Sequence, residues 1–440
     1  MTAIARFARS DGPVPSLSLG QGHEAGSPIT MSITPGAAAN EADSTHADIP
    51  AVALDPFDKT FLSDPVRYHP SLRDAAPVFY LSKYGIYGMA RFAPVKAALD
   101  DHVTFCSGRG VGLSDFSKEA PWRPPSLLLE TDPPEHDRAR RIVNRVVSLT
   151  AVRHLNDKWA LAATQLVDEL VARKTVDFIT DVAEIFPLSV FPDAIGIQKA
   201  GRENLLPYAS ATFNAFGPRN ELFEATNAVT GKSIHWVAES CKRSNLQEGG
   251  WGMAVHEAAD RGECTEAEAE RLVRSFLSAG VDTTVNGIGN MLYAFAQHPE
   301  QWQALRANPS LVKKAFEESL RWLSTVQTFF RTTTRAIDVE GYRLPEGSKV
   351  LLFLAAANRD PQKWVDAADF KIDRTLGGHV GFGSGIHACL GQMVARLEGE
   401  LVLSALVRRI KSIRPAGPAV RRLNNTLLAF ANVPVEIEPL

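Results

Sequence analysis

The sequence predicts a mainly helical protein with small β-sheets, an α+β arrangement in which helices dominate. Residues 151–260 have the pattern of several amphipathic helices separated by Pro and Gly. Helical periodicity then extends from a capping box at Thr265 and Glu268 to Gln297, ahead of Pro299. At about 30 residues, this stretch is much longer than the usual globular helix, so we expect it to cross the whole domain.

Composition excludes several classes of protein. The chain has 440 residues, of which 45% are hydrophobic and 22% are charged, and its net charge is -3. A nucleic-acid partner is not expected, because such proteins usually carry a basic excess. No apolar run approaches the roughly 20 residues of a membrane span. Cys106, Cys241, Cys264 and Cys389 are too few and too scattered for a disulfide framework, which favours the reducing cytoplasm.

The first residues differ in composition from the rest of the chain. Residues 1–48 are rich in Gly, Pro, Ser, Ala and Thr and have no sustained periodicity, so we expect a disordered leader. Arg6 and Arg9 suggest a targeting peptide as the alternative, but the missing apolar segment argues against secretion. From Ile49 onward the composition is that of a globular protein.

Short strands and an irregular stretch follow the leader. Two β-like runs, residues 77–84 and 85–92, predict a hairpin of a small sheet. A helix is expected over residues 93–101. Residues 106–136 are too polar and too rich in Pro and Gly for regular structure. A loop of this length inside a compact domain is usually functional.

Further short strands are expected towards the C-terminus. Residues 326–360 contain alternating runs with turns at Glu340–Gly341 and Glu346–Gly347, which predict short antiparallel strands. The tail, residues 424–438, predicts a final hairpin.

A glycine-rich loop with one cysteine, GFGSGIHACLG at residues 381–391, is the most informative stretch. Glycine permits positive φ angles and close approach of the backbone, so we expect this loop to press on something flat. A helical pattern begins at Gln392, and the amides and dipole at its N-terminus favour the thiolate form of Cys389. Cys389 could be a buried structural cysteine, a zinc ligand with His387, a nucleophile or an axial ligand of haem iron. Zinc is disfavoured because the chain has no Cys-x-x-Cys pair, and the glycine cradle favours haem.

The spacing Phe-Gly-x-Gly-x-His-x-Cys-x-Gly, from Phe382 to Gly391, resembles the haem-binding signature of the cytochrome P450 family. The resemblance implies one large helical domain at residues 49–440. A haem b would be buried in it between the long helix and the helix that follows Cys389. Cys389 would be the axial ligand of the iron, and Phe382, Gly383 and Gly391 would contact the haem.

Basic side chains elsewhere resemble the family's donors to the two haem propionates. His136 and Arg140 follow Asp-Pro-Pro at i, i+4 on one face of a predicted helix, for which a basic surface helix is the alternative interpretation. Arg331 matches the position that reaches the second propionate, and His387 matches another donor. Carboxylates on an otherwise apolar cofactor need charge-assisted donors of this kind.

The middle of the long helix reads AGVDTT from Ala279. Gly280 and two threonines cost stability in a helix interior, so we expect a local opening that leaves the Thr283 hydroxyl free to bond a ligand or water. A simple kink would explain the same residues. The A-G-x-D-T pattern is similar to the family's oxygen-binding groove, which implies that Asp282 and Thr283 deliver protons to bound dioxygen.

A third motif implies a structural role. Glu318 and Arg321 lie at i, i+3 and resemble the family's buried ion pair, with Arg374 ahead of the cysteine loop completing the set. An ordinary surface pair would contribute well under about 1 kcal/mol. Removing one partner of a buried set costs several kcal/mol, so we assign these residues to folding and haem retention.

The resemblance also implies an activity. The protein would be a monooxygenase that uses dioxygen to hydroxylate a C–H bond, or to dealkylate where the carbon carries an ether oxygen. Electrons would come from a separate iron–sulfur ferredoxin and its NADH-dependent flavin reductase, and we expect a cytoplasmic monomer. A peroxygenase, which has no need of Asp282 and Thr283, and a non-catalytic haem-binding or sensing protein are the alternatives.

Several segments resemble a bacterial subfamily that oxidises para-substituted benzoic acids, including 4-methoxybenzoate. The segments are GRGVGLSDF, PWRPPS, NAFGP, RSFLSAG and VQTFFRTTTR. We hypothesise that Arg123, Ser126 and Ser275 grip the substrate carboxylate, with Arg274 as electrostatic support. The alternatives are that both arginines are ordinary surface or structural residues, and that the substrate is another small hydrophobic molecule.

A set of mostly apolar residues is expected to wall the aromatic ring and point its para substituent at the iron. The wall residues are Leu129, Phe213, Phe216, Val326 and Phe329. Ser275 is expected to share the haem-facing side of its helix with Ala279 and Asp282. Core packing is the alternative interpretation of Phe213 and Phe216.

Overall fold

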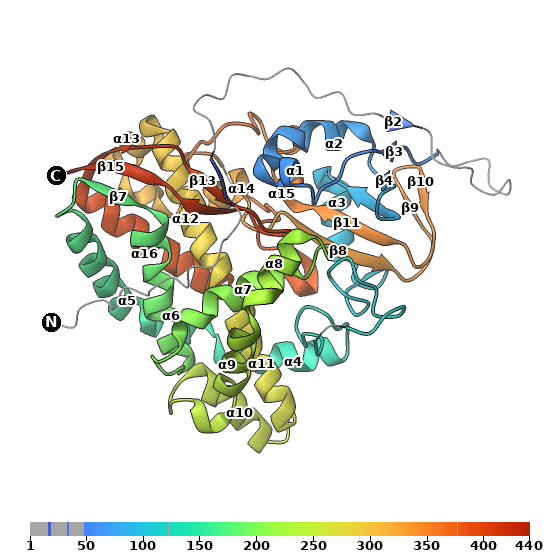
Figure 1. Ribbon diagram of the computed structural model, residues 1–440, viewed down its shortest axis with the longest axis horizontal. Coiled ribbons are helices and arrows are strands. Elements are labelled where there is room, and N and C mark those ends of the chain that lie inside the picture. The colour runs from blue at the N-terminus through green and yellow to red at the C-terminus, as the bar shows by residue number, and fades with distance from the viewer. Residues whose placement is uncertain (1–15, 19–32, 35–47, 122, 376) are drawn as a thin grey trace.

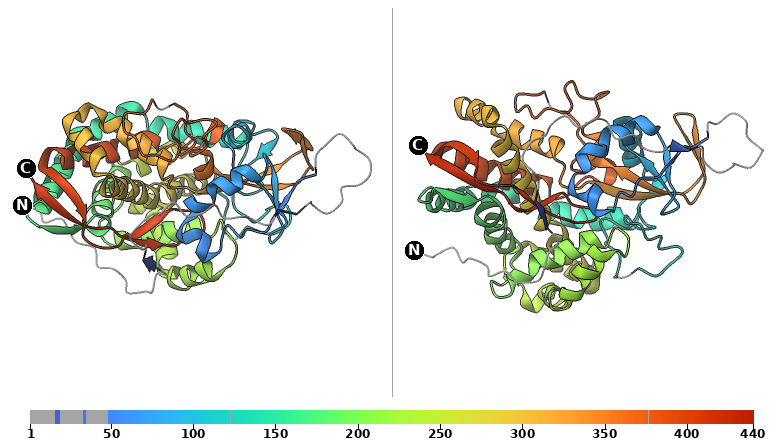
Figure 2. Two further views of the ribbon diagram at one scale, coloured as in Figure 1. Left: turned by 90° about the horizontal axis from the view of Figure 1, so that it is seen from above. Right: turned by 45° about the horizontal axis from the view of Figure 1, so that its top comes forward.

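The computed structural model describes residues 16–18, 33–34, 48–121, 123–375 and 377–440. Helices fill the left and lower parts of the molecule in Figure 1, and the largest sheet lies to the upper right. The two views in Figure 2 show the same division into a helix-rich and a sheet-rich part. The predicted mainly helical class is therefore confirmed. None of the described helices is long and apolar enough to cross a membrane.

Helices form the larger part of the described chain. The α-helices are α1 Lys59–Ser63, α2 His69–Ala75, α3 Phe92–Asp100, α4 Glu135–Val146, α5 Leu149–Leu170, α6 Ile185–Ile195, α7 Leu205–Asn214, α8 Glu221–Val229, α9 Gly231–Ser240, α10 Trp251–Asp260, α11 Glu266–Ala279, α12 Asp282–Gln297, α13 Pro299–Ala307, α14 Val312–Trp322, α15 Leu354–Ala357 and α16 Gln392–Arg409. Short 3-10 helices are η1 Pro65–Tyr68, η3 Arg202–Asn204, η4 Arg243–Asn245, η5 Pro309–Leu311 and η6 Gly385–His387. A short π-helix is η2 Ile179–Ala183. The amphipathic helices predicted between residues 151 and 260 are thus present as α5 to α10.

Strands gather into small sheets. They are β1 Ser16–Ser18, β2 Ile33–Thr34, β3 Ala51–Val52, β4 Phe79–Leu81, β5 Ile86–Met89, β6 Phe105–Cys106, β7 Thr175–Asp177, β8 Thr328–Thr333, β9 Ile337–Val339, β10 Tyr342–Leu344, β11 Lys349–Phe353, β12 Ile410–Pro415, β13 Val420–Arg422, β14 Ala429–Asn432 and β15 Pro434–Pro439. Within the described residues, the largest sheet has the order β2-β3-β4-β5-β11-β8-β6. The predicted hairpin is present as β4 and β5, and β8 and β11 are antiparallel as expected.

Helix α12 lies at the centre of the helical part. Every residue from 281 to 296 is buried except Thr283. A helix that is covered on all sides belongs to the core, and α12 contacts η2, α14 and α16. Helix α16 in turn packs along α5. The cysteine loop ends at the start of α16. Because α16 contacts α12, the loop leads into the same hydrophobic core that contains α12.

Three predictions about regular structure are corrected. The helix expected over residues 265–297 is two helices, α11 and α12, separated at Gly280–Val281. The final hairpin is wrong, because β14 pairs with β13 while β15 pairs with β12 and β7. Two pieces of the predicted leader are strands, since β1 pairs with β13 and β2 pairs with β3. The remainder of the leader, residues 1–15, 19–32 and 35–47, lies outside the described residues.

Candidate haem and substrate site

The cysteine loop is a tight turn that leads into α16. Gly383 and Gly385 have positive φ angles of 71° and 68°, which glycine adopts without strain. A Cβ atom at residue 385 would also lie 2.5 Å from the carbonyl oxygen of Leu99 in α3. The amide of Cys389 donates to the carbonyl of Phe382 at 2.8 Å. The loop therefore fixes the sulfur just ahead of the first turn of α16, as predicted.

The Cys389 thiol responds to two opposing influences. Burial raises the pKa of Cys389, whereas the amides of Gly391 and Gln392 and the guanidinium of Arg140 lower it. The amides at the start of α16 favour the thiolate, as predicted, but burial is the larger effect and leaves the pKa of Cys389 raised in the polypeptide alone. A metal ion at the sulfur would supply the missing positive charge and hold the thiol deprotonated.

Two histidine rings meet beside the loop, and the Nε2 atom of His387 lies 3.8 Å from Asp132 Oδ1. The rings of His136 and His387 are 4.4 Å apart between centroids. Their Nδ1 atoms contact Asp137 at 3.0 Å and the carbonyl oxygen of Leu128 at 3.1 Å, respectively. Both Nε2 atoms are buried without a hydrogen-bond partner in the described part of the chain. Burial lowers the pKa of His136, and the nearby charges of His387 and Arg140 act in the same direction.

Two arginines near these rings lack a carboxylate partner among the described residues. Arg331, in β8, is 5% exposed, and its Nη1 donates to the carbonyl of Phe330 at 2.8 Å. Burial lowers the pKa of Arg331 to about 10. Burial also lowers the pKa of Arg140, in α4, which the Cys389 sulfur opposes. A buried or partly buried cation without an anion is costly, so both positions suit an anionic ligand.

The junction of α11 and α12 opens the central helix as predicted. The Thr283 hydroxyl donates to the carbonyl of Ala279 at 2.6 Å, and the Thr284 hydroxyl donates to that of Gly280 at 3.1 Å. The side chains thus satisfy carbonyls that the break has released. The expectation of a free Thr283 hydroxyl is therefore half right, because its hydrogen is engaged and its lone pairs are not.

The predicted structural ion pair is buried in the core. Arg321 Nε and Glu318 Oε2 are 2.7 Å apart, and both side chains are 0% exposed. Arg374 joins at 3.2 Å from Glu318 Oε1. The other Arg321 nitrogens donate to carbonyls of Asn358, Ala367 and Asp369, between α15 and the cysteine loop. The set therefore ties α14 to the segment that leads to Cys389.

Comparison with known proteins settles the family. A family model described as Cytochrome P450 matches residues 246–438. Over 394 residues, the chain is 52% identical to Cytochrome p450 CYP199A2 of Rhodopseudomonas palustris, an alignment that covers 89% of this chain and 96% of that protein. The chain belongs to the cytochrome P450 family.

More distant relatives agree. The P450 is 33% identical over 292 residues to Cytochrome P450 107B1 of Saccharopolyspora erythraea, with 66% of this chain and 71% of that protein covered. The solved structure of P450BioI, in complex with an acyl carrier protein ligated to hexadec-9Z-enoic acid, has a TM-score of 0.77 and 26% identity, and the match covers 86% of this chain and 100% of that one. The protein is therefore a P450 monooxygenase, for which the cofactor is haem with an axial cysteine thiolate and the co-substrate is dioxygen.

The residues of the P450 fit this cofactor. Two propionates require hydrogen-bond donors with spare capacity. The Nε2 atoms of His136 and His387 have no hydrogen-bond partner among the described residues, and Arg331 is buried without a carboxylate partner there. Arg140 is partly buried, and burial lowers its pKa. Phe382 and Gly391, also predicted as haem contacts, lie in the cysteine loop, and Phe382 packs under the guanidinium of Arg396, which is 4.6 Å from the ring centroid.

The carboxylate of Asp282 is held by residues that the sequence does not single out. Its Oδ1 atom accepts from Arg422, in β13, at 2.5 Å and from the Asn286 amide at 3.0 Å. Its Oδ2 atom is buried without a hydrogen-bond partner in the described part of the chain. Asp282 is 0% exposed, whereas Ser275 and Ala279 are partly exposed, and their shared haem-facing side stays a prediction.

The structure brings the five predicted wall residues together. Phe213 and Phe216 form a buried cluster with Val111 and Leu427, and Leu129, Val326 and Phe329 pack against it; we call this set the aromatic cluster. The rings of Phe213 and Phe216 meet edge to face at 5.7 Å. Phe216 also lies 5.8 Å from Phe329 between centroids. Segments from four parts of the chain therefore form one apolar wall.

The predicted carboxylate-binding residues lie on one loop and on α11. Arg123 Nη1 and Arg274 Nη2 both donate to the carbonyl of Pro124, at 3.1 and 2.8 Å. Arg123 is also paired with Glu130 at 3.0 Å, a contact that the sequence did not reveal. Ser126 is buried, and its hydroxyl accepts from the amide of Leu129 at 3.2 Å.

Helix α11 adds a further guanidinium to this loop. Arg271 Nη2 donates to the carbonyl of Pro125 at 2.5 Å. Ser275, which is partly exposed, donates its hydroxyl hydrogen to the carbonyl of Arg271 at 3.1 Å. Arg271 lies four residues before Ser275, and this spacing places both on one face of a helix. The spacing could therefore have predicted from the sequence that Arg271 lies near Ser275.

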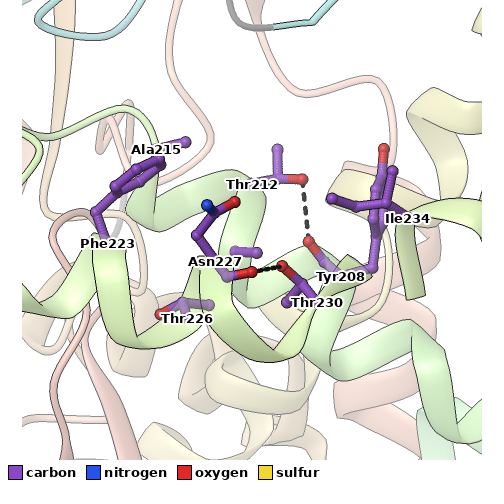
Figure 3. Close-up of a pocket in the computed structure, with 9 residues that line it drawn as sticks. Tyr208, Thr212, Ala215, Phe223, Thr226, Asn227, Thr230 and Ile234 are labelled. Atoms are coloured by element: carbon purple, nitrogen blue, oxygen red, sulfur yellow. Dashed lines mark hydrogen bonds between the residues drawn. The ribbon is translucent and has the colours of Figure 1, made fainter. Parts of the chain in front are cut away.

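A small pocket between α7, α8 and α9 lies apart from these residues (Figure 3). Figure 3 shows Thr212 donating to the carbonyl of Tyr208, at 3.0 Å, on one side of it. The pocket encloses about 20 Å³. That is room for about one water molecule, so the pocket does not hold an aromatic acid.

Proposed function

We propose that this P450 oxidises small aromatic carboxylic acids, hydroxylating or O-dealkylating para-substituted benzoates such as 4-methoxybenzoate. The observation that carries the proposal is the aromatic cluster, which is continuous with an arginine-bearing loop through the bond between Leu129 and Ser126. Ligand sites are mostly apolar with a few converging polar groups. An aromatic ring with one carboxylate has the complementary chemistry.

Charge near the loop supports an anionic substrate. Arg123, Arg271 and Arg274 all donate to carbonyls of Pro124 or Pro125, so three guanidiniums gather at one turn. Glu130 pairs with Arg123 at 3.0 Å, and the charges of Glu268 and Glu130 oppose the lowering of the Arg271 pKa by burial. Each charged hydrogen bond to a substrate carboxylate contributes about 1.5–3 kcal/mol.

The residues on the distal side would orient the substrate and manage protons. Bound haem supplies the activation of dioxygen, which the Cys389 thiolate promotes by electron donation. The aromatic cluster excludes water from the aromatic ring of the substrate. The loop that carries Arg123 fixes the carboxylate of the substrate. The unpartnered Oδ2 atom of Asp282 can take up a proton, and the Thr283 hydroxyl keeps lone pairs that can accept a hydrogen bond.

A P450 takes electrons from a redox partner. We propose an iron–sulfur ferredoxin served by a separate NADH-dependent flavin reductase, and a monomeric enzyme in the cytoplasm, with residues 49–440 as the haem domain. Turnover that requires ferredoxin, reductase and NADH supports this scheme. Equal turnover with hydrogen peroxide alone would contradict it and favour a peroxygenase.

Ligand titration followed by the haem spin shift tests the substrate class. In Arg123→Ala, the affinity for 4-methoxybenzoate should fall about 10- to 100-fold, because one charged hydrogen bond is lost. The affinity for the neutral carboxamide of the same acid should change little. Lys118→Ala, which removes an exposed cation from the same region, serves as the matched control. Equal losses for acid and amide, or no loss for either, would remove Arg123 from the carboxylate site.

A further inference from the structure

Lys349, the first residue of β11, is a buried ammonium with all its donors in use. It is 8% exposed. Its Nζ donates to the carbonyls of Gly110 and Ser114 at 2.8 Å each and to that of Arg109 at 3.2 Å. Burial lowers the pKa of Lys349 to about 8, and the nearby carboxylate of Asp115 opposes that lowering. At neutral pH the side chain therefore presents three N–H donors to three carbonyls of a single loop.

The loop, residues 109–116, is curled so that these carbonyls face inward. Gly110 has a φ of 94°, a conformation that favours glycine. The carbonyl of Arg109 also accepts from the amide of Phe116 at 3.1 Å. Arg109 and Asp115 close the outer side with an ion pair at 2.9 Å. In Figure 1, the segment between β6 and α4 that contains this loop lies beside β8.

The same loop carries part of the aromatic cluster. Val111 is a buried member of the cluster, and its carbonyl accepts from the amide of Phe330 at 3.1 Å. The amide of Leu113 donates to the carbonyl of Phe216 at 2.8 Å. At Gly112, an added Cβ would lie 2.8 Å from the Cα of Phe216. The backbone of the loop therefore sets where Phe216 and Val111 stand.

We propose that Lys349 is a positioning residue for the substrate, because its ammonium clamps residues 109–114 and so fixes the wall formed by Val111 and Phe216. This inference rests on the proposed function in one respect, namely that the aromatic cluster receives the substrate ring. Without the ammonium, the carbonyls of Gly110 and Ser114 would lose the donor that Lys349 supplies, and that of Arg109 would keep only the amide of Phe116, so the loop would turn to satisfy them elsewhere. A wall displaced by a fraction of an ångström binds the ring less well and orients it less well.

The test uses the full-length holoenzyme with Lys349→Met, which keeps the apolar stem and removes the donors. We expect about a 10-fold weaker affinity for 4-methoxybenzoate, with KM raised more than kcat is lowered. Amide hydrogen exchange should rise in residues 107–116. Haem content and the reduced carbon monoxide spectrum should not change. If Lys349→Met does not accumulate, the same measurements are made on Lys349→Gln, which keeps two donors on a shorter side chain.

Val350→Ala is the matched control. Val350 is also buried in β11, but it packs on the opposite face of the strand, in a cluster separate from Leu351 and Phe353. Val350→Ala should lower the melting temperature of the protein. It should not raise amide hydrogen exchange in residues 107–116 or weaken the binding of 4-methoxybenzoate. Equal weakening by both variants, or wild-type affinity in Lys349→Met, would overturn the positioning role.

The two proposals fail separately. If the wild type shows no spin shift with 4-methoxybenzoate or related acids, the proposed substrate class is wrong, and exchange in residues 107–116 still decides whether Lys349 clamps the loop. If the wild type binds the acid but loop exchange in Lys349→Met is unchanged, the clamp is wrong and the substrate class stands.

Discussion

Cations of low exposure in two regions of this P450 differ in what neutralises them. On the side where we propose the haem propionates, Arg331 is buried without a carboxylate partner among the described residues. Around α12 and the loop that carries Arg123, each of two cations is paired with a carboxylate of the protein itself. Arg123 pairs with Glu130 at 3.0 Å, and Arg422 pairs with Asp282 at 2.5 Å.

The difference matches how long each ligand stays. A propionate belongs to a cofactor that remains bound, so its charge can be the permanent partner of Arg331. A substrate carboxylate or a proton comes and goes in every cycle. A resident carboxylate keeps the distal cations neutralised between those events, since an unpaired buried charge would be costly.

The largest expected effect separates pairing from proton handling at Asp282. Asp282→Asn preserves the shape of the side chain but removes the charge and the unpartnered oxygen acceptor. We expect kcat to fall about 100-fold, because a positioned acid–base group contributes at least that much. Affinity for 4-methoxybenzoate should be unchanged in the spin-shift titration.

Asn286→Ala is the control for Asp282→Asn, because it removes one hydrogen bond to Asp282 and leaves the carboxylate in place. It should lower kcat only slightly. A wild-type kcat in Asp282→Asn would mean that the carboxylate serves Arg422 alone.

A smaller effect is expected on the haem side. Arg331→Gln should accelerate haem loss about 10- to 100-fold, because a charged hydrogen bond to a propionate disappears. Transfer of haem to apomyoglobin measures this rate. Arg335→Gln, at an exposed arginine of the same region, should leave the rate unchanged. Equal rates in all three proteins would show that Arg331 is a structural cation, and the contrast between the two sides would disappear.

The smallest effect concerns Glu130. Glu130→Gln removes the carboxylate that pairs with Arg123. We expect 4-methoxybenzoate to bind about threefold more tightly at low salt, with less gain at high salt as charges are screened. Glu119→Gln, which removes an exposed acidic side chain, is the control. Weaker binding in Glu130→Gln would mean that Glu130 holds the loop together more than it competes with the substrate.

Motifs with fixed local spacing were predictable from the sequence. The turn before Cys389, the ion pair of Glu318 and Arg321 and the opening before Thr283 each depend on residues within one or two turns of chain. The aromatic cluster was also anticipated, although its members come from distant segments. In that case the resemblance to a subfamily supplied the grouping, and periodicity alone did not.

Contacts between distant segments were not predictable. Arg422 reaches Asp282 across 140 residues, and Lys349 reaches Gly110 across 239. The residues that flank Arg422 and Lys349 in the sequence do not predict that either side chain makes these contacts. The tail fails for the same reason, because β14 and β15 alternate like a hairpin but find other partners, β13 for the first and β12 and β7 for the second.

The reduced carbon monoxide spectrum tests most directly whether Cys389 is the thiolate ligand of haem iron. Wild-type protein, and Cys264→Ala as a control at a second partly exposed cysteine, should show a strongly red-shifted Soret band. Cys389→Ala should lose that band completely. A wild type without the band, or a Cys389→Ala protein that binds haem with an unaltered spectrum, would contradict the account.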